Sequence, residues 1–403
     1  MRIGSALREQ RLRLGLSVTE AASIGDVPRS YLSMVETGKR APNPEVLVRF
    51  TRKVNIPKDV WMPVFLEDER RCSRLLALGR ALVEEGDFET ARKALGCALF
   101  ASRRVRDGRY NSELYKMLGR THYALGHYRQ ALRWFTLQKR AVRHSGNTRM
   151  QAATSYNIAQ CMTKVGRDLE AMPMFDEAIR IFTRLRLWME LGKAWLAKGN
   201  YYLSRRSYRE AFPAYRRAAH FLRGKPLHGD ALLGAAITTW QLRGIDTARP
   251  LFDAIVASEH SDVLLRAKAR LNLAIALRGT SRLDEALREL EIVLADRERL
   301  PSRLAAIMLA EETLCHVLRD DTVSARLALE GYKAIPGEKD TQDIAAMRIL
   351  ARVLGASPPP EELRESIWDE HDHRFAAAMA VLQARSRRQG STLRSGVTGE
   401  VRG

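Results

Sequence analysis

Cysteine is scarce in this sequence, and long apolar runs are missing. The four cysteines among 403 residues lie far apart and lack the paired spacing of a zinc site or a redox motif. We expect them to be small core residues in a reducing compartment. No apolar stretch is long enough to cross a bilayer, so we expect no membrane span. The first residues lack an apolar segment followed by a cleavage site, which favours a cytoplasmic protein.

Recognisable catalytic signatures are missing as well. The sequence contains neither a nucleotide-binding loop nor a nucleophile elbow. His371 and His373 flank Asp372, but on a helix residues two apart point in different directions and do not easily share an ion. We therefore expect no enzyme, no metal ion and no cofactor.

Acidic residues are too few to balance the basic ones. The chain has 67 Lys and Arg against 47 Asp and Glu, a net charge of +20, and the segment 1–54 carries ten basic and five acidic side chains. This excess favours an anionic partner such as nucleic acid. Lysine makes up only a small part of the basic set, and a GC-rich genome produces such an arginine bias without selection for binding. Charge therefore supports nucleic-acid binding but does not establish it.

Small residues recur at a fixed interval through most of the chain. Alanines return with a period of 40, and another small residue stands 12 positions before each of them. Such an offset indicates two helices that approach closely at the same point of every unit, and the period predicts a solenoid of helical hairpins. The interval then shortens to steps of 37, 38 and 39, and the pattern fades at Thr313 and Ala325. The first four pairs are Gly79 with Ala91, Gly119 with Ala131, Ala159 with Ala171, and Gly199 with Ala211.

One of these units carries a recognisable motif. Starting at Leu118, it reads L-G-x(3)-Y-x(2)-G-x-Y-x(2)-A-x(3)-F and closely resembles the tetratricopeptide repeat. Six units in series match one template, a seventh is degenerate, and the resemblance covers about residues 72–335. It implies a right-handed α-solenoid. The usual period of this repeat is about 34 residues. We expect the additional six positions to lengthen the second helix of each unit or the loop after it.

The segment 1–60 predicts short helices separated by turn residues. Ser17 begins a second helix and has Glu20 as its capping-box partner. Gly25 and Asp26 form a turn, and Pro28 starts a third helix. Five short helices with a tight turn between the second and third make a helix-turn-helix. The runs LREQRLRLGLSVTEAA and VPRSYLSMVETGKRAPNPEVLVRF resemble the XRE family of bacterial DNA-binding domains over roughly residues 3–60.

The resemblance implies that the third helix is the recognition helix. Arg29 or Ser30 would reach base edges in the major groove, where arginine suits guanine. Lys39 and Arg40 would contact phosphates and set the register. Glu36 is implied to be a helix-end or arginine partner rather than a DNA contact. The exposed positions of this helix are Arg29, Ser30, Ser33, Met34 and Thr37.

Two residues depart from the family pattern. Val18 stands where the family usually has a glutamine that bridges phosphate and base. Met34 stands where an arginine or lysine is frequent. These departures predict a different operator, modest affinity, or reliance on thymine methyl contacts.

The first helix of each repeat is expected to line the concave face of the solenoid. Amides pair bidentately with a peptide backbone, and basic side chains bind a terminal carboxylate, so such a face suits an extended peptide. The alternative is that these residues are ordinary solvated or packing side chains. The predicted peptide contacts are Lys116, Arg120, Tyr123, Tyr156, Asn157, Gln160, Lys164, Asn200, Trp240 and Asn272.

The pattern divides the chain into five segments. Residues 55–71 contain two prolines and are expected to hold no helix longer than about two turns, which makes them the candidate hinge. The helix after the SPPP segment is expected to cap the solenoid or to form a dimer contact. The expected segments are a DNA-binding domain over 1–60, a linker over 61–71, about seven repeats with a period near 40 over 72–356, a C-terminal helix over 361–388, and a disordered basic tail over 389–403.

An XRE-type domain followed by such an array resembles the peptide-responsive quorum-sensing regulators of the RRNPP group. The resemblance implies an all-α, homodimeric transcriptional regulator that binds a double-stranded DNA operator and whose repeats bind a short signalling peptide. Two alternatives stay open. The repeats bind a protein partner or a small molecule instead, or the chain is a scaffold or inhibitor of a response regulator for which DNA binding is secondary.

Overall fold

The computed structural model describes residues 3–68, 72–105, 110–143, 145–336, 341–356 and 380–381. Within these ranges the chain is helical and contains no strand. It divides into two compact units, Met1–Ala197 and Lys198–Gly403. The all-helical fold class predicted from the sequence is therefore confirmed.

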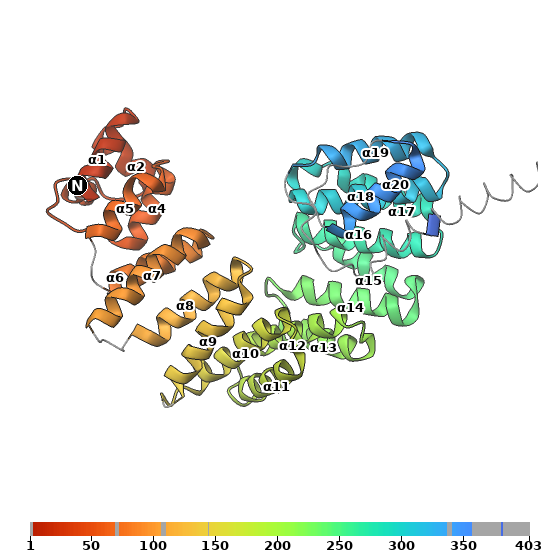
Figure 1. Cartoon of the computed structure of the whole chain (residues 1–403), viewed down its shortest axis with the longest axis horizontal. Coiled ribbons are helices and arrows are strands. Elements are labelled where there is room, and N and C mark those ends of the chain that lie inside the picture. Colours follow the sequence, from red (N-terminus) through yellow and green to blue (C-terminus); the bar gives the residue numbers. More distant parts are fainter. Residues whose placement is uncertain are drawn as a thin grey trace, which may run out of the picture. The chain divides into compact units, whose positions relative to one another are not determined.

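Five short helices form the N-terminal domain (Figure 1). The predicted capping box is present, since the Ser17 side chain accepts from the Glu20 amide while the Glu20 carboxylate accepts from the Ser17 amide. Gly4 lies so close to α3 that a Cβ there would meet the Val35 carbonyl oxygen at 2.0 Å. The five helices are α1 (Ile3–Arg13), α2 (Val18–Gly25), α3 (Arg29–Glu36), α4 (Pro44–Lys53) and α5 (Lys58–Asp68).

Helix α5 corrects one expectation. It is 11 residues long and contains Pro63, so the prediction of no helix longer than two turns over residues 55–71 is wrong. Trp61 and Phe65 are buried at 0% and 2% exposure, with their rings 6.5 Å apart. Their burial outweighs the local cost of the proline, which removes one backbone hydrogen bond. Residues 61–68 are thus part of a packed helix, and residues 69–71 lie outside the described ranges.

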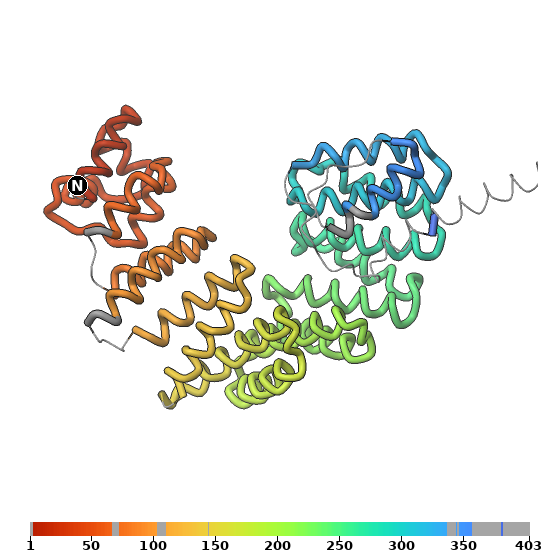
Figure 2. Tube along the Cα trace, viewed as in Figure 1, coloured from red at the N-terminus to blue at the C-terminus, as the bar shows by residue number. Residues whose placement is uncertain are grey.

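The repeats of the first unit are consecutive helix pairs, which the tube of Figure 2 follows from the N-terminal helices onward. Helix α12 (Trp188–Ser204) begins in this unit and ends in the next. One hydrophobic core runs without a break from Leu7 of α1 to Leu118 of the second pair. The pairs are α6 (Cys72–Glu84) with α7 (Phe88–Val105), α8 (Asn111–Ala124) with α9 (Tyr128–Val142), and α10 (Thr148–Lys164) with α11 (Asp168–Arg184).

The second unit continues in the same way. The degenerate seventh repeat of the sequence forms a regular pair, α18 with α19, and one further helix packs on it. Its helices are α13 (Tyr208–Phe221), α14 (His228–Arg243), α15 (Ile245–Ala257), α16 (Val263–Gly279), α17 (Leu283–Leu294), a short 3-10 helix (Arg297–Arg299), α18 (Ser302–Leu318), α19 (Thr322–Ala334) and α20 (Thr341–Leu354).

The small residues of the sequence pattern lie where paired helices cross. A Cβ on Gly79 would meet the Leu95 side chain at 2.5 Å, and one on Gly119 would meet the Phe135 ring at 2.5 Å. In both of these repeats the large residue, Leu95 or Phe135, stands four positions after the recurring alanine. The small residue therefore accommodates a bulky side chain that reaches across from the second helix. The recurring alanines are fully buried: Ala91, Ala131, Ala171, Ala211, Ala248, Ala286 and Ala325.

The extra residues of each unit fall in more than one place. Second helices α7 and α11 are long, at 18 and 17 residues. First helices α10 and α12 are also 17 residues long, against 13 for α6. The additional length therefore extends the following first helix as well as the second helix, which refines the expectation.

Several expectations concern residues outside the described ranges. They include the C-terminal helix predicted over 361–388, of which only residues 380–381 are described, and the basic tail over 389–403. His371 and His373, which were not expected to bind a metal, also lie outside the described ranges. Among the helices that the structure describes, none is both long enough and apolar enough to cross a bilayer.

Candidate DNA-binding and peptide-binding surfaces

Helix α3 presents most of its predicted DNA contacts to solvent. Its buried apolar residues, Leu32 and Val35, face the domain core, so the helix has a buried and an exposed face. Met34 is half-buried, unlike the other predicted contacts. The exposed ones are Arg29, Ser30, Ser33 and Thr37 in and beside the helix, and Lys39 and Arg40 in the loop after it.

The loop after α3 is held by Tyr31. The Tyr31 hydroxyl accepts a hydrogen bond from the Asn43 backbone N–H at 2.8 Å, and Asn43 in turn caps α4. The Arg40 guanidinium lies over the Tyr31 ring, 4.9 Å from its centroid, a geometry that favours a cation. The basic loop is thus fixed at the end of the exposed helix, where a phosphate contact would position the helix on DNA.

A buried ion pair joins α1 to the end of α3. The Arg11 Nε and Nη2 donate to the two Glu36 carboxylate oxygens at 2.7 and 2.9 Å. The two side chains are only 6% and 5% exposed. The implied role of Glu36 as an arginine partner is confirmed, and the pair orients α3 from its buried side.

The two departures from the family pattern have different surroundings. Val18 is partly buried and packs against the domain core. It therefore contributes to packing at the position where a glutamine would hydrogen-bond to DNA. Met34 is half-buried and follows the exposed Ser33, so an apolar side chain stands at the position where the family frequently has an arginine or lysine.

The N-terminal domain rests directly on the first repeat. An Arg74 Nη2 donates to the Pro42 carbonyl at 2.7 Å. Lys58 of α5 forms an ion pair with Asp87, at the turn between α6 and α7. Burial alone would raise the pKa of Asp87, but hydrogen bonds from Lys58 and Thr90 outweigh it and hold the pKa below its ordinary value. These contacts join the N-terminal domain, which contains α3, to the start of the array.

A hollow of about 290 Å³ brings four of the predicted peptide contacts together. This lies at the small end of the range of ligand pockets, roughly 300–1,000 Å³. Three successive helix pairs contribute to it. Its lining residues are Val83, Phe88, Arg120, Tyr123, Ala124, Phe135, Asn157 and Gln160.

The polar groups of this hollow are available to a ligand. In the described part of the chain, no hydrogen bond or ion pair engages the side chains of Arg120, Asn157 or Gln160. Burial raises the pKa of the Tyr123 hydroxyl to about 12, so this group remains a neutral donor. An arginine, two amides and a hydroxyl around an apolar floor suit a peptide backbone and a carboxylate.

Three further predicted contacts of the first unit have neighbours within the chain. Lys116 forms an ion pair of 2.6 Å with Glu113. The Tyr156 ring packs edge-on against Phe175, with centroids 6.1 Å apart. Lys164 places its Nζ 6.0 Å from the Tyr128 ring centroid. None of the three lines the hollow.

The predicted contacts of the second unit also have intramolecular roles. The Tyr215 hydroxyl donates to the Asn200 side-chain oxygen at 2.8 Å. The Asn272 side-chain nitrogen donates to the Lys268 carbonyl at 2.8 Å. Trp240 is half-buried against the hydrophobic core of the unit. Asn200, Trp240 and Asn272 therefore remain predictions as ligand contacts.

Sequence reasoning did not identify the apolar part of the hollow. Val83 and Phe88 come from the preceding repeat, and Phe135 comes from a second helix. Each of these residues matches the repeat template as a core residue. The pattern within a single repeat does not show that the residue also lines a hollow shared with a neighbouring repeat.

Comparison with protein families identifies the N-terminal segment. The helix-turn-helix family matches residues 7–61. These residues form a helix-turn-helix domain. Helix α3 is the second helix of the motif, and the match ends within α5, just beyond the boundary at residue 60 that the sequence analysis placed.

Solved structures resemble the array. The apo form of the quorum sensor NprR from B. thuringiensis is 14% identical, with a TM-score of 0.55, covering 78% of this chain and 97% of its own. A tetratricopeptide repeat protein from Parabacteroides merdae ATCC 43184 is 18% identical, with a TM-score of 0.50, covering 70% of this chain and 97% of its own. At these identities the likeness shows the fold alone. A comparison with curated protein sequences finds no match.

Proposed function

We propose that this chain is a DNA-binding transcriptional regulator whose repeats sense a short peptide and thereby switch operator binding. The helix-turn-helix match over residues 7–61 supports the DNA-binding half. The observation that carries the sensing half is the hollow around Arg120, Tyr123, Asn157 and Gln160, which offers an arginine, two amides and a hydroxyl to a ligand. The fold that the chain shares with the quorum sensor NprR adds to it.

A ligand in this hollow would touch three helix pairs at once. Phe88 belongs to the first pair, Tyr123 to the second and Asn157 to the third. A peptide that bridges them binds best to one spacing of the pairs, and such a difference in affinity between shapes is what a switch requires. The continuous core from Leu7 to Leu118 then connects the first two of these pairs to the helix-turn-helix domain.

The DNA-binding half would operate as a homodimer on a palindromic operator. Two copies of α3 would enter the major groove at half-sites roughly 34 Å apart, or a multiple of that distance. A change in the shape of the array would alter the spacing of the two copies, and the affinity for the operator would follow.

Two variants separate sensing from DNA binding. Operator fragments are first selected from genomic DNA with the full chain. Synthetic peptides encoded by short reading frames beside the gene are then added, and DNA affinity is measured by fluorescence anisotropy. We expect Asn157→Ala and Gln160→Ala to weaken the peptide response about tenfold or more while DNA affinity without peptide stays unchanged. Gln130→Ala, which removes an exposed amide on α9 outside the hollow, is the matched control.

Each outcome bears on one half of the proposal. If Gln130→Ala and Gln160→Ala have the same effect, the hollow does not bind the peptide. If DNA affinity falls together with the peptide response, Asn157 is structural. If a protein or a small molecule, and no peptide, changes DNA affinity, the sensing half is replaced by that ligand. If no operator is enriched at all, the scaffold reading stands in place of the regulator.

A further inference from the structure

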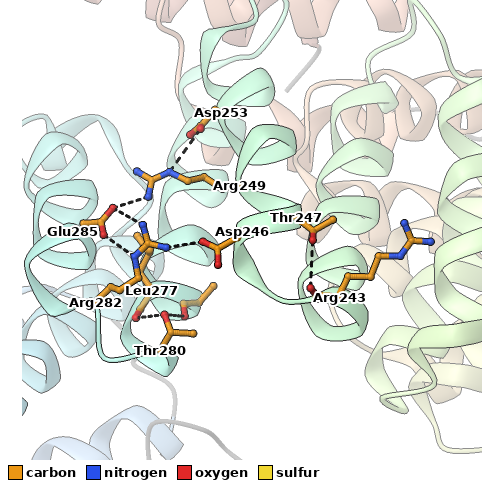
Figure 3. Close-up of polar contacts among 10 residues, drawn as sticks. Arg243, Asp246, Thr247, Arg249, Asp253, Leu277, Thr280, Arg282 and Glu285 are labelled. Carbon is orange, nitrogen blue, oxygen red and sulfur yellow. Dashed lines mark hydrogen bonds and ion pairs between the residues drawn. The ribbon is translucent and has the colours of Figure 1, made fainter.

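A balanced ion network joins two successive repeats of the second unit (Figure 3). The Arg282 Nη1 donates to Asp246 at 2.8 Å, while its Nε and Nη2 donate to Glu285 at 2.6 and 2.9 Å. Arg249 donates to the same Glu285 at 2.6 Å. Asp246 and Arg249 lie on α15, and Glu285 lies on α17. Both arginines at this junction thus have a carboxylate from the chain itself.

At the junction of the second and third helix pairs, the positions equivalent to this network hold side chains of different charge. Counting from the recurring alanine, Arg167 occupies the position of Arg282 and keeps the same local partner, Glu170, at 2.8 and 2.6 Å. The position of Asp246 is taken by Arg129. In the network of the second unit, Asp246 pairs with Arg282. At this junction the equivalent of Asp246 is an arginine, Arg129, so Arg167 has no acid from the preceding pair at that position.

The position of Arg249 changes as well. It is taken by Leu132, which cannot cross to the acid that Arg249 reaches. A hollow of about 610 Å³ lies at this junction, between α9 and the turn from α10 to α11. We call it the arginine hollow. Its basic lining residues are Arg129, Arg133, Arg140 and Arg167, and its apolar ones include Leu132, Leu137 and Val165.

Three of the four arginines of the arginine hollow lack a counterion in the described part of the chain, whereas Arg167 pairs with Glu170. No ion pair or hydrogen bond engages the guanidinium groups of Arg129, Arg133 or Arg140 there. Two residues after Arg167, at the start of α11, Leu169 is 93% exposed. Unpaired arginines next to exposed apolar surface are the features that mark a docking site rather than a solvated face.

We propose that the arginine hollow docks an acidic, amphipathic segment of a partner protein, whose carboxylate takes the place that Asp246 fills in the second unit. Arginine binds carboxylates bidentately, which matches this residue type to that partner. The apolar lining residues of the hollow favour a segment with leucine-like side chains over a free anion, which would leave them uncovered. The site lies on α9, a second helix, and shares no residue with the hollow proposed for the signalling peptide.

The test uses the full chain and a defined probe. The probe is a short labelled peptide with two glutamates one helical turn apart and two leucines beside them, and its binding is measured by fluorescence anisotropy. Arg129→Asp rebuilds the charge pattern of the α15–α17 junction within the chain, because the new carboxylate would pair with Arg167. We expect this variant to fold normally and to weaken probe binding about tenfold or more.

A matched control makes the same charge change elsewhere. Arg209 stands two positions before its recurring alanine, as Arg129 does, and is exposed. We expect Arg209→Asp to bind the probe as the unmodified chain does. Arg133→Gln, which removes one charge without adding an acid, is a second variant that keeps the test valid if Arg129→Asp fails to fold.

Four results would overturn the proposal. The first is that the unmodified chain has no measurable affinity for the probe, and the second is that Arg209→Asp weakens binding as much as Arg129→Asp does. The third is that a probe with glutamines in place of glutamates binds equally well. The fourth is that Arg129→Asp lowers affinity for duplex DNA as strongly as for the probe, which would mean that the arginines contact nucleic acid. Selective loss of probe binding in Arg129→Asp and Arg133→Gln, with the control unchanged, supports it.

Discussion

The Arg11 guanidinium and the Glu36 carboxylate form a bidentate pair that is almost completely buried between α1 and α3. The third donor group of Arg11, its Nη1, reaches the Leu16 carbonyl at 2.6 Å. The hydrogen bonds of Arg11 therefore give partners to the Glu36 carboxylate and to one backbone carbonyl of the loop before α2. The pair fixes α3, the predicted recognition helix, relative to α1 without using any residue of the exposed face.

Removing one partner of this pair should destabilise the helix-turn-helix domain strongly. Glu36→Gln leaves the Arg11 charge buried without a counterion, a change that typically costs about 3–5 kcal/mol. Hydrogen exchange followed by mass spectrometry localises the loss to α1 and α3. Glu9→Gln is the control, because Glu9 pairs with Arg13 at the surface and exposed pairs contribute about 1 kcal/mol or less. Equal effects of the two variants would contradict the structural role given to Glu36.

Two glycines of the first unit should respond oppositely to alanine. A Cβ on Gly119 would lie 2.5 Å from the Phe135 ring, so Gly119→Ala overpacks the crossing and costs about 1–3 kcal/mol. Gly96 is exposed within α7, and a methyl group added there would have no neighbour within 4 Å. Gly96→Ala should therefore stabilise the chain by about 0.5–1 kcal/mol through lower backbone entropy. Urea unfolding measures both, and a stabilising Gly119→Ala would show that the crossing is looser than this geometry indicates.

The predicted DNA contacts should separate into sequence-specific contacts and general phosphate contacts. Lys39→Ala should weaken binding to all DNA sequences about equally and lower the salt slope of binding by about one unit. Arg29→Ala should reduce discrimination between operator and non-operator DNA by about 1–3 kcal/mol. Titrations at several salt concentrations distinguish the two. A uniform loss for both variants would place Arg29 on the phosphate backbone.

The sequence predicted the helix pairs well because close crossings permit few residue types. A Cβ on Gly79 or Gly119 would lie within 3 Å of a bulky side chain, so close packing favours small residues at these positions. The capping box at Ser17 and Glu20 is likewise local, and local hydrogen bonds can be read from spacing. Helix α5 was missed because its stability comes from the burial of Trp61, a tertiary effect that local propensity does not contain.

The candidate site was predictable only in part, for the same reason. Helical register placed Arg120, Tyr123, Asn157 and Gln160 among the inward positions, and these four line one hollow. Register does not reveal which polar groups already have partners. Asn200 matches the template of an inward amide, yet its side chain accepts a hydrogen bond from a tyrosine on the next helix. Such pairing depends on the distance between helices, which a single sequence does not specify.

The ion network of the second unit should make its stability sensitive to acid. Hydrogen bonds from Arg282 and Arg249 lower the pKa of Glu285 from 4.5 to about 2. A carboxylate whose pKa is lowered by folding contributes its stabilisation fully above its unfolded pKa and loses it as the pH falls toward the folded pKa. The contribution of Glu285 should therefore be present at neutral pH and disappear between about pH 4.5 and 2. Glu285→Gln should reduce the urea midpoint of the second unit at neutral pH. On acidification, the stability of this variant should fall less than that of the unmodified chain. Glu298→Gln removes an exposed carboxylate of the same unit outside the network, and an identical acid profile for both variants would show that the network contributes nothing to folding.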